Sequence, residues 1–448
     1  MTSMRRAAGA ALADLLRSAT FARAYTVTAL AAGFLTTAIH AVNGPVVVAT
    51  IVAGLAAIGA AILVARRDEL SFIGFAPTSL VLFVVWAITS LAWALDGTHS
   101  RTLGAWLALV AWTVIGVTIA HVRDTLQIAR AVGDVLRWLL TASLAAEVLS
   151  GIILDVPFET LGIEGLIAYG GPIQGLFGSR NLLGFVAVLG LVTFIIEWRA
   201  RAVARQVAVY SIVLAAVLVV FSGSPTALVL VVMLVVAELA LSAARRTPRE
   251  RRRRANAVIA SFTAAAFALA LLLHRPIIDF FAARSGFATR AELWSEVVSW
   301  VRHRPITGWG FFGTWQNEPF PTNIVNLSLD SPHGSALNAF FDVLLQLGWV
   351  GLLLFAVLAV LALARAWLAA ADRRSVVYAW LPLTLVALLV ESMFESYTVS
   401  DLGWLLLVVC AVRAGQERSW RREIDPTAPI PPPATPAPGH QGSAGSAG

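Results

Sequence analysis

The sequence contains no lysine, only one cysteine and few charged residues of any kind. All 33 basic residues are arginine, and only 13% of the 448 residues are charged. The single cysteine, Cys410, lies in an apolar run, which excludes a disulfide framework. Apolar residues dominate instead, because 58% of the chain is hydrophobic and the mean hydropathy is +0.79. A soluble protein needs a larger polar shell, so this composition indicates a membrane protein.

Motifs for nucleotide and metal binding are also missing. We find no Walker loop, no GxGxxG motif followed by a helix, and no cysteine or histidine spacing that suits a metal. The net charge of +7 does not indicate a nucleic acid partner, because arginine in a membrane protein usually reports the orientation of the chain. We therefore expect no metal, no cofactor and no nucleic acid, and the bilayer as a partner.

Apolar runs of roughly bilayer-crossing length recur along the whole chain and predict an all-α polytopic membrane protein. The predicted spans are 25–42, 46–65, 71–94, 102–120, 136–154, 181–197, 207–221, 225–243, 256–273, 338–363, 376–395 and 399–412. These twelve spans imply that both termini lie on one side of the membrane.

The arginines predict which side that is. If the N-terminus is cytoplasmic and the chain alternates, 26 of the 33 arginines fall in cytoplasmic segments and seven fall outside. We therefore expect a basic cytoplasmic N-terminal segment over 1–24, a transmembrane domain over 25–412 and a disordered cytoplasmic tail over 413–448. The largest extracytoplasmic loop, 274–337, has no predicted span, and a long segment of this kind usually carries function.

Two arginines stand close together in that loop, although arginine is scarce outside the cytoplasm. Arg284 comes just before a predicted amphipathic helix, 290–303, and Arg290 falls in the first turn of that helix. Helix N-termini favour anions, and paired guanidinium groups bind phosphate through charge-assisted hydrogen bonds. The pair is therefore a candidate phosphate clamp. The alternative is that these arginines contact lipid headgroups or pair with Asp279 and Glu292.

Three further segments carry candidate residues. In 304–315, glycines interleaved with aromatics predict a tight turn, in which Trp309 stacks on a sugar ring or joins an interfacial aromatic belt. Ser331 and Pro332 predict the start of the helix that becomes the tenth span. This start places His333 in the first turn of the helix, as a proton acceptor, and Asn338 a little over one turn deeper. The alternative for His333 is a structural role.

The third segment is 175–192, in which Arg180 and Asn181 lie at the outer mouth of the sixth span. A third outer arginine adds to the same positive site if the fold brings it there. Otherwise it extends to the membrane interface in the ordinary way.

Taken in order, these motifs resemble the O-antigen ligase/polymerase superfamily of bacterial membrane glycosyltransferases. The resemblance covers about 175 to 363. The matching residues are Gly175 or Gly178 with Asn181, then Arg284, Thr289, Arg290, Trp294, Pro305, Gly308, Gly310, Asn338 and Gly348. The chain departs from the family pattern in two places. Leu337 stands where many members have histidine directly before asparagine, and Pro225 stands where members often have arginine.

The resemblance implies a GT-C-like fold and a metal-independent enzyme in the bacterial cytoplasmic membrane, with its active site on the extracytoplasmic face. Such an enzyme transfers a glycan from a polyprenyl (undecaprenyl) diphosphate carrier to a glycan, lipid or protein acceptor. The first predicted outer loop, HAVNGP, has no carboxylates, which argues against metal-dependent relatives. The implied catalytic residues are His333 and Arg290, and the implied substrate-binding residues are Arg284, Arg180, Asn181, Asn338 and Trp309.

Two other functions stay open. A lipid-linked glycan flippase or a secondary transporter would need polar residues in mid-membrane, and Glu147 is the obvious candidate. A non-catalytic scaffold for envelope assembly is the third possibility. Because most polar residues gather in the outer loops, the sequence favours the enzyme.

Overall fold

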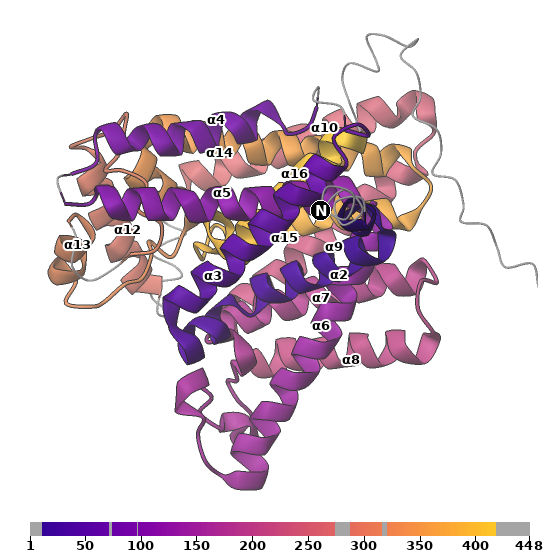
Figure 1. Ribbon diagram of the computed structural model, residues 1–448, viewed down its shortest axis with the longest axis horizontal. Helices are drawn as coiled ribbons and strands as arrows, with labels where there is room; N and C mark the ends of the chain where they lie inside the picture. The colour runs from indigo at the N-terminus through magenta and orange to yellow at the C-terminus, as the bar shows by residue number, and fades with distance from the viewer. Residues whose placement is uncertain (1–10, 71–73, 96, 274–286, 316–319, 418–448) are drawn as a thin grey trace, which may run out of the picture.

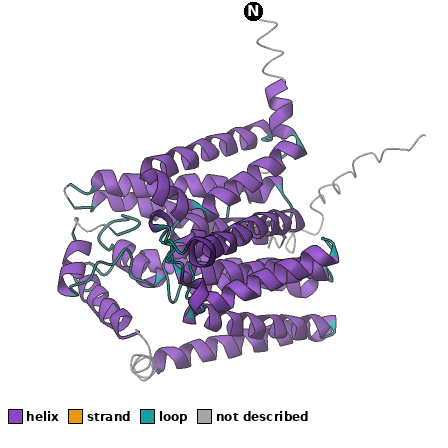
Figure 2. Ribbon diagram, turned by 90° about the horizontal axis from the view of Figure 1, so that it is seen from below, coloured by secondary structure: helices purple, strands orange, loops and turns teal. Residues whose placement is uncertain are grey.

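The protein is a bundle of helices that run mostly lengthwise, with shorter helices and loops at one end (Figures 1 and 2). The computed structural model describes residues 11–70, 74–95, 97–273, 287–315 and 320–417. Within these ranges the chain forms helices and turns, and the one β-bridge joins Phe158 to Ile163. The all-α prediction is therefore confirmed.

The α-helices are joined by connections of very different lengths, and the one between α6 and α7 contains several short helical turns. The α-helices are α2 (Ala19–Phe34), α3 (Thr36–Ala65), α4 (Thr78–Thr89), α5 (His99–Val122), α6 (Thr125–Val148), α7 (Arg180–Arg199), α8 (Arg205–Ser222), α9 (Pro225–Arg246), α10 (Arg249–Leu272), α12 (Phe287–Val301), α13 (Thr322–Ser328), α14 (Ala339–Asp372), α15 (Trp380–Glu391) and α16 (Asp401–Glu417). Each of the twelve predicted spans overlaps one of these helices.

Not all of these helices meet the usual criteria for crossing a membrane. In the described ranges, seven segments are long and apolar enough by length and composition: Thr36–Ala65, His99–Val122, Thr125–Leu154, Arg180–Arg199, Arg205–Ser222, Pro225–Arg246 and Ala339–Asp372. Two shorter apolar segments are Thr78–Ala92 and Val376–Glu391. The structure thus supports a multi-pass membrane protein, and the count of twelve spans stays a prediction.

The predicted turn HAVNGP coincides with a break inside α3. Two helical segments that share the label α3 meet at this point. The helix is kinked there, because Gly44 has φ 79° and Pro45 follows it. The tail begins later than predicted, since α16 continues past 412 and ends at Glu417.

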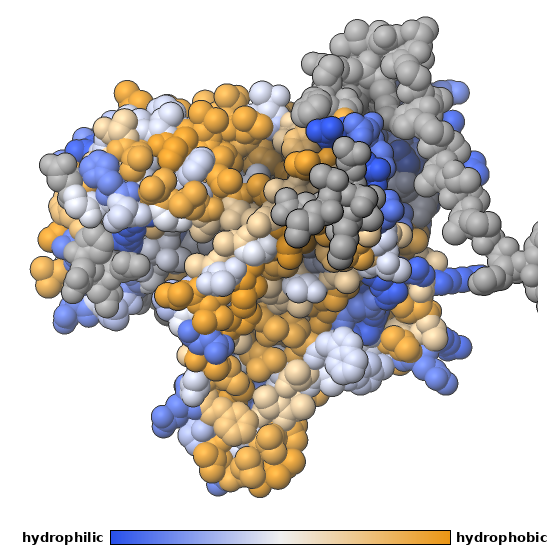
Figure 3. Space-filling model, in the orientation of Figure 1, coloured by the Kyte–Doolittle hydropathy of each residue, from blue (hydrophilic) through white to orange (hydrophobic). Residues whose placement is uncertain are grey.

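The centre of the bundle is α16, which is buried along most of its length. Trp404 is fully buried and donates a hydrogen bond from Nε1 to Thr113 Oγ1 at 2.9 Å. Trp380, at the start of α15, is equally buried and donates to Thr193 Oγ1 at 3.0 Å. The outer surface is apolar too. Figure 3 shows hydrophobic side chains over α4, where Val81, Leu82 and Val85 are about half exposed, as expected for helices that face lipid.

The region between α10 and α14 has a hydrophobic core of its own, at the end of the bundle where Figure 1 shows α12 and α13. Leu293, Val297 and Val301 form one buried face of α12 and pack against buried aromatic residues of the following loop. The predicted amphipathic helix is confirmed, and it begins three residues earlier, at Phe287. We call this region, 287–338, the outer lobe.

The outer lobe joins the bundle where α14 is broken. Gly348 has φ 65°, and the helix changes direction there. The loop before it supplies backbone partners across the break: Trp309 N–H donates to Leu345 O at 3.0 Å, Gly310 N–H donates to Gln346 O at 2.9 Å, and Trp349 N–H donates to Pro305 O at 2.8 Å. A Cβ on Gly308 would lie 2.5 Å from Gln346 backbone atoms. The close backbone approach predicted for this glycine turn is thus confirmed.

The predicted span 338–363 agrees with α14, but the helix does not begin at Ser331 and Pro332 as expected. α14 begins at Ala339, and Asn338 is its N-cap, with Oδ1 accepting from Phe340 N–H at 2.9 Å and Phe341 N–H at 3.2 Å. His333 therefore lies in the loop before the helix and not in its first turn. Asparagine is a strong N-cap, and here it competes successfully with the Ser331–Pro332 signal.

Candidate active site

Arg290 extends from the first turn of α12 into the junction between the outer lobe and the bundle. Its side chain is only 16% exposed, and it forms an ion pair with Glu395, from Nη2 to Oε1 at 2.9 Å. Nη1 donates to the carbonyls of Leu337, at 3.2 Å, and of Phe394. The predicted alternative partner Asp279 lies outside the described residues. The observed partner, Glu395, is more than 100 positions away in sequence.

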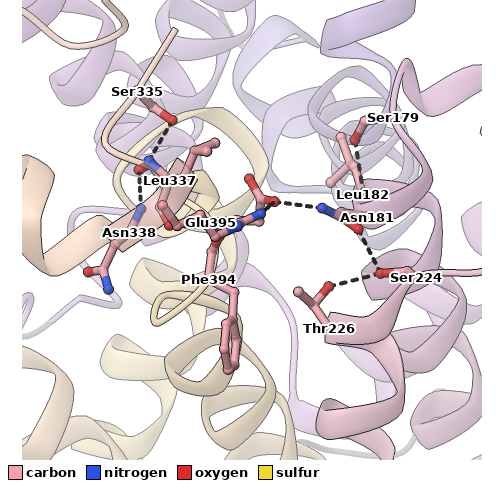
Figure 4. A network of polar contacts seen from close by, with 12 residues as sticks. Ser179, Asn181, Leu182, Ser224, Thr226, Ser335, Leu337, Asn338, Phe394 and Glu395 are labelled. Carbon is pink, nitrogen blue, oxygen red and sulfur yellow. Dashed lines mark hydrogen bonds and ion pairs between the residues drawn. The ribbon is translucent and has the colours of Figure 1, made fainter. Parts of the chain in front are cut away.

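Asn181 reaches the same carboxylate from α7 (Figure 4). Its Nδ2 donates to Glu395 Oε1 at 2.8 Å, and its Oδ1 accepts from Ser224 Oγ at 2.8 Å. The Ser224 hydroxyl also lies 2.9 Å from that of Thr226. Two of the predicted site residues, Arg290 and Asn181, are therefore brought to one oxygen atom, and the network continues to the start of α9.

Asn338 approaches the same turn of the chain from α14. Its backbone N–H donates to Ser396 Oγ at 3.2 Å, and its Nδ2 donates to Met393 O at 2.9 Å. Because Oδ1 caps the helix, every polar group of this buried side chain is already used. The structure places Asn338 in the site, where it holds the 393–396 turn against α14.

Three helix N-termini thus meet at this turn. The N-caps are Ser179 for α7, Ser224 for α9 and Asn338 for α14. The Ser179 hydroxyl lies 3.2 Å from that of Tyr397, just past the turn, and burial raises the Tyr397 pKa, so this phenol stays protonated. The positive ends of helices attract anions, and Arg290 adds a full charge. Within the described residues, the negatively charged group that this arrangement holds is the Glu395 carboxylate.

Sequence reasoning missed the carboxylates at this site. Glu391 and Glu395 stand four residues apart in the apolar run "ESMFES", and acidic residues in such runs are functional candidates. Glu391 is 1% exposed, and neither of its oxygens has a hydrogen-bond partner in the described ranges. Glu147, the candidate we named for mid-membrane, accepts from Gln174 N–H at 3.0 Å and Gly175 N–H at 2.7 Å, and so anchors a loop.

Two predicted site residues, Arg180 and His333, have side-chain polar groups without a hydrogen-bond partner among the described residues. Arg180 is the first residue of α7 and is exposed, with no ion pair or hydrogen bond to the residues that the structure describes. His333 is fixed through its backbone, whose N–H donates to Asn326 Oδ1 at 3.1 Å. Its Nε2 is buried and has no partner within the described ranges, and burial lowers the His333 pKa below 6.5.

Two other predicted residues do not join the site. Trp309 is 9% exposed and lies in the core of the outer lobe, where its ring packs edge-on against Trp300 and Phe320. Its Nε1 donates to Trp300 O at 3.1 Å, and the Arg304 guanidinium covers it at 4.7 Å. Neither sugar stacking nor a lipid-facing belt fits this position. Arg284 lies outside the described residues.

A cavity of about 370 Å³ lies between α5, the 311–314 loop and the start of α16, and its lining includes neither Arg290 nor Glu395. Its walls are mostly apolar, with Arg101 and Asp401 as the charged residues. Arg101 Nη2 donates to Thr314 O at 2.7 Å, and Asp401 accepts from Trp112 Nε1 at 3.1 Å. An apolar hollow with few polar groups suits a lipid-linked or sugar ligand.

Hydrogen bonds to Asp342 connect the outer lobe to the 393–396 turn, so loss of one of them should destabilise the protein. Trp315 Nε1 donates to Asp342 Oδ1 at 2.6 Å, and Asp342 Oδ2 accepts from Ala336 N–H at 3.0 Å and from the Ser396 hydroxyl. We expect Trp315→Phe to cost about 1–3 kcal/mol of unfolding free energy, because a buried carboxylate loses a donor.

The measurement is the thermal unfolding midpoint of purified protein in detergent. Trp349→Phe is the matched control, because Trp349 is 58% exposed. Equal midpoints for the two variants would contradict a stabilising role for the Trp315–Asp342 hydrogen bond.

Comparison with family models gives a match over part of the chain. The sequence profile of the O-antigen ligase family matches residues 210–356, a stretch that includes Ser224, Arg290 and Asn338. No curated protein sequence matches the chain. The match confirms the resemblance that the motifs indicate, and it supports a membrane protein with a glycan-transfer role in polysaccharide assembly. Among the described residues no group of three or more potential metal ligands comes together, and metal independence stays a prediction.

Proposed function

We propose, from the premise that this chain is a member of the O-antigen ligase superfamily, that it transfers a glycan from a polyprenyl diphosphate to an acceptor hydroxyl. The observation that carries the proposal is the convergence of Arg290 and three helix N-termini on the 393–396 turn. Diphosphate is the anion that leaves in such a reaction, and here it would compete with the Glu395 carboxylate for Arg290.

The same proposal assigns the orientation and the location of the chain. Twelve spans and cytoplasmic termini follow from the distribution of arginines, and they place the outer lobe on the extracytoplasmic face of a bacterial cytoplasmic membrane. The lipid carrier then reaches the site from the bilayer. The cavity beside Arg101, with apolar walls, offers space for the lipid or for the acceptor.

The proposed glycan transfer forms one bond and breaks another. The acceptor oxygen bonds to the anomeric carbon while the bond from that carbon to the diphosphate oxygen breaks. The electron pair leaves with the diphosphate, and the acceptor proton passes to His333. Glu395 and two carbonyls hold the guanidinium of Arg290 in place, and the diphosphate competes with Glu395 for it. Arg180, exposed beside Asn181, supplies a second cation.

Direct assay of transfer tests the proposal. Purified protein in proteoliposomes is given a polyprenyl-diphosphate glycan together with a glycan or lipid acceptor, and the product is resolved by gel and mass spectrometry. We expect a longer or newly attached glycan and release of polyprenyl diphosphate. Carrier that stays intact with every acceptor, in protein shown to be folded, would contradict the proposal.

The transporter alternative has two observations in its favour. Glu391 is a buried carboxylate with no partner among the described residues, and Arg137 and Glu197 form a buried ion pair between α6 and α7. Charges inside a membrane domain are typical of transport pathways. A flippase moves the carrier between leaflets without breaking its sugar–phosphate bond, so the same proteoliposome assay separates the two functions by product and by sidedness.

His333 should act as the proton acceptor, since its Nε2 has no partner among the residues that the structure describes. We expect His333→Ala to lower transfer by about 10²–10⁴-fold, as for loss of a general base. The neutral imidazole is the active form, and burial lowers its pKa below 6.5. Transfer should therefore stay constant from pH 8 to 6.5 and fall only at lower pH.

The control for this prediction is His303→Ala, because His303 is exposed on the outer lobe. We expect this variant to keep both the rate and the pH profile of the wild type. A wild-type rate in His333→Ala would remove His333 from the mechanism.

A further inference from the structure

A second charged cavity lies at the opposite end of α7 from the Arg290 site. Asn181 is at the first turn of α7 and Glu197 near its last, and sixteen residues of helix span about 24 Å. The cavity has a volume of about 430 Å³. Its polar lining residues are Arg23, Arg123, Gln127, Arg130, Asp134 and Glu197.

The acidic residues of this cavity are largely neutralised by Arg137, which is not itself a lining residue. Arg137 forms ion pairs with Asp134 at 2.8 Å and with Glu197, and it donates to Ser211 Oγ at 2.9 Å. Arg23 lies 3.6 Å from the other oxygen of Asp134. The basic groups are therefore in excess, and an anion would meet a net positive surface.

Two arginines have donors to spare. Arg130 uses Nη2 to donate to Ala202 O at 2.8 Å, and its side chain is otherwise exposed. Arg123 makes no hydrogen bond to the described residues, and its Nε is buried. Guanidinium groups with open donors on one hollow are a phosphate-binding arrangement.

One acceptor is also left over in the same cavity. Glu197 is 1% exposed, and its Oε1 has no hydrogen-bond partner in the described ranges. A buried acceptor without a donor is costly, so it favours a ligand that brings a hydroxyl group. The cavity thus combines donors for a phosphate with an acceptor for a hydroxyl.

The surface around the cavity is typical of a membrane interface. Trp138 is one turn along α6 from Asp134 and is 78% exposed, and Trp198 follows Glu197 and is 50% exposed. Tyr210 on α8 is also 50% exposed. Exposed tryptophan and tyrosine side chains concentrate where headgroups meet acyl chains, which favours a lipid as the source of the phosphate.

We propose that this cavity binds the headgroup of a phospholipid whose phosphodiester carries a free hydroxyl group, as in phosphatidylglycerol. Arg123 and Arg130 hold the phosphate, and Glu197 accepts the hydroxyl. Basic pockets between helices are known to recognise anionic lipid headgroups. The site is separate from glycan transfer, and its function does not depend on that activity.

The test is the thermal unfolding midpoint of the full chain in detergent, titrated with phosphatidylglycerol, phosphatidylcholine or glycerol 3-phosphate. We expect phosphatidylglycerol to raise the midpoint and phosphatidylcholine, which has no hydroxyl on its headgroup, to have little effect. The Arg123→Gln/Arg130→Gln double variant should need about 25-fold more phosphatidylglycerol for the same shift, at about fivefold per arginine.

Two variants complete the design. Arg67→Gln is the matched control, because its side chain is 72% exposed outside the cavity, and it should respond as the wild type does. Val203→Trp fills the cavity without removing a charge and should lose the response, which keeps the test decisive if the double variant does not fold.

The outcomes separate cleanly. An equal shift with glycerol 3-phosphate would support the phosphate site and assign it to a soluble ligand. A wild-type response to phosphatidylglycerol in both the double variant and Val203→Trp would overturn the proposal, as would the absence of a shift with every probe. Because no glycan is present, failure here leaves the proposed transferase function untouched.

Discussion

Replacement of Arg290 by glutamine is expected to lower glycan transfer in proteoliposomes by about 10²–10³-fold, the usual cost of losing one preorganised charge stabiliser. The reason is positional. The Arg290 side chain is only 16% exposed, and its guanidinium is fixed by Glu395 and two carbonyls. A cation that is already oriented requires no rearrangement when the diphosphate leaves.

The same substitution leaves a buried carboxylate without its partner, so stability has to be separated from activity. Loss of one member of a buried ion pair typically costs about 3–5 kcal/mol. Adding Glu395→Gln to Arg290→Gln should restore much of that stability, because a neutral amide needs no counter-charge, and transfer should stay low.

The control is Arg302→Gln, because Arg302 is an exposed arginine of the same lobe. We expect its transfer rate to stay within about twofold of the wild type. A stable double variant that transfers glycan at the wild-type rate would show that Arg290 holds the outer lobe in place and does not take part in the reaction.

The second large effect is expected from Gly348→Ala, at the break in α14. Gly348 has φ 65°, and a Cβ there would lie 2.2 Å from Ile306 O. Backbone strain and overpacking together should cost about 2–5 kcal/mol, and they act where the outer lobe joins the bundle. We expect a lower unfolding midpoint and a lower yield of folded protein.

Gly54→Ala is the matched control for this prediction. Gly54 lies in α3 with no atom within 4 Å of its added Cβ and without a positive φ, so alanine should be neutral or slightly stabilising there. Equal unfolding midpoints for Gly348→Ala and Gly54→Ala would be inconsistent with a tight backbone junction between α14 and the segment 305–310.

The helices could be predicted well because their signal is local and long. Each apolar run is a continuous stretch, and hydropathy alone identifies it. α12 was also predictable, since Leu293, Val297 and Val301 repeat at helical spacing. The start of α14 was not, because Ser331 and Asn338 both suit an N-cap, and tertiary contacts to Ser396 and Met393 favour the second.

The site was predictable in part. Arg290 was predicted from its unusual position outside the cytoplasm, and Asn181 from its place at the mouth of a span and from the family motif. In the structure both donate to Glu395 Oε1. Glu395 was not named, since no sequence rule pairs residues more than 100 positions apart. Trp309 was expected to meet a sugar, but alternating glycine and aromatic residues do not reveal whether a ring faces inward, and here Trp300 and Phe320 enclose it.

The central claim is that a diphosphate binds between Arg290 and the N-termini of α7 and α9. The most direct measurement is an experimental structure with a non-transferable polyprenyl-diphosphate glycan bound. The account predicts phosphate oxygens within hydrogen-bond distance of Arg290, beside Asn181 and Ser224. A diphosphate bound elsewhere on the protein, with Arg290 still paired to Glu395, would contradict it.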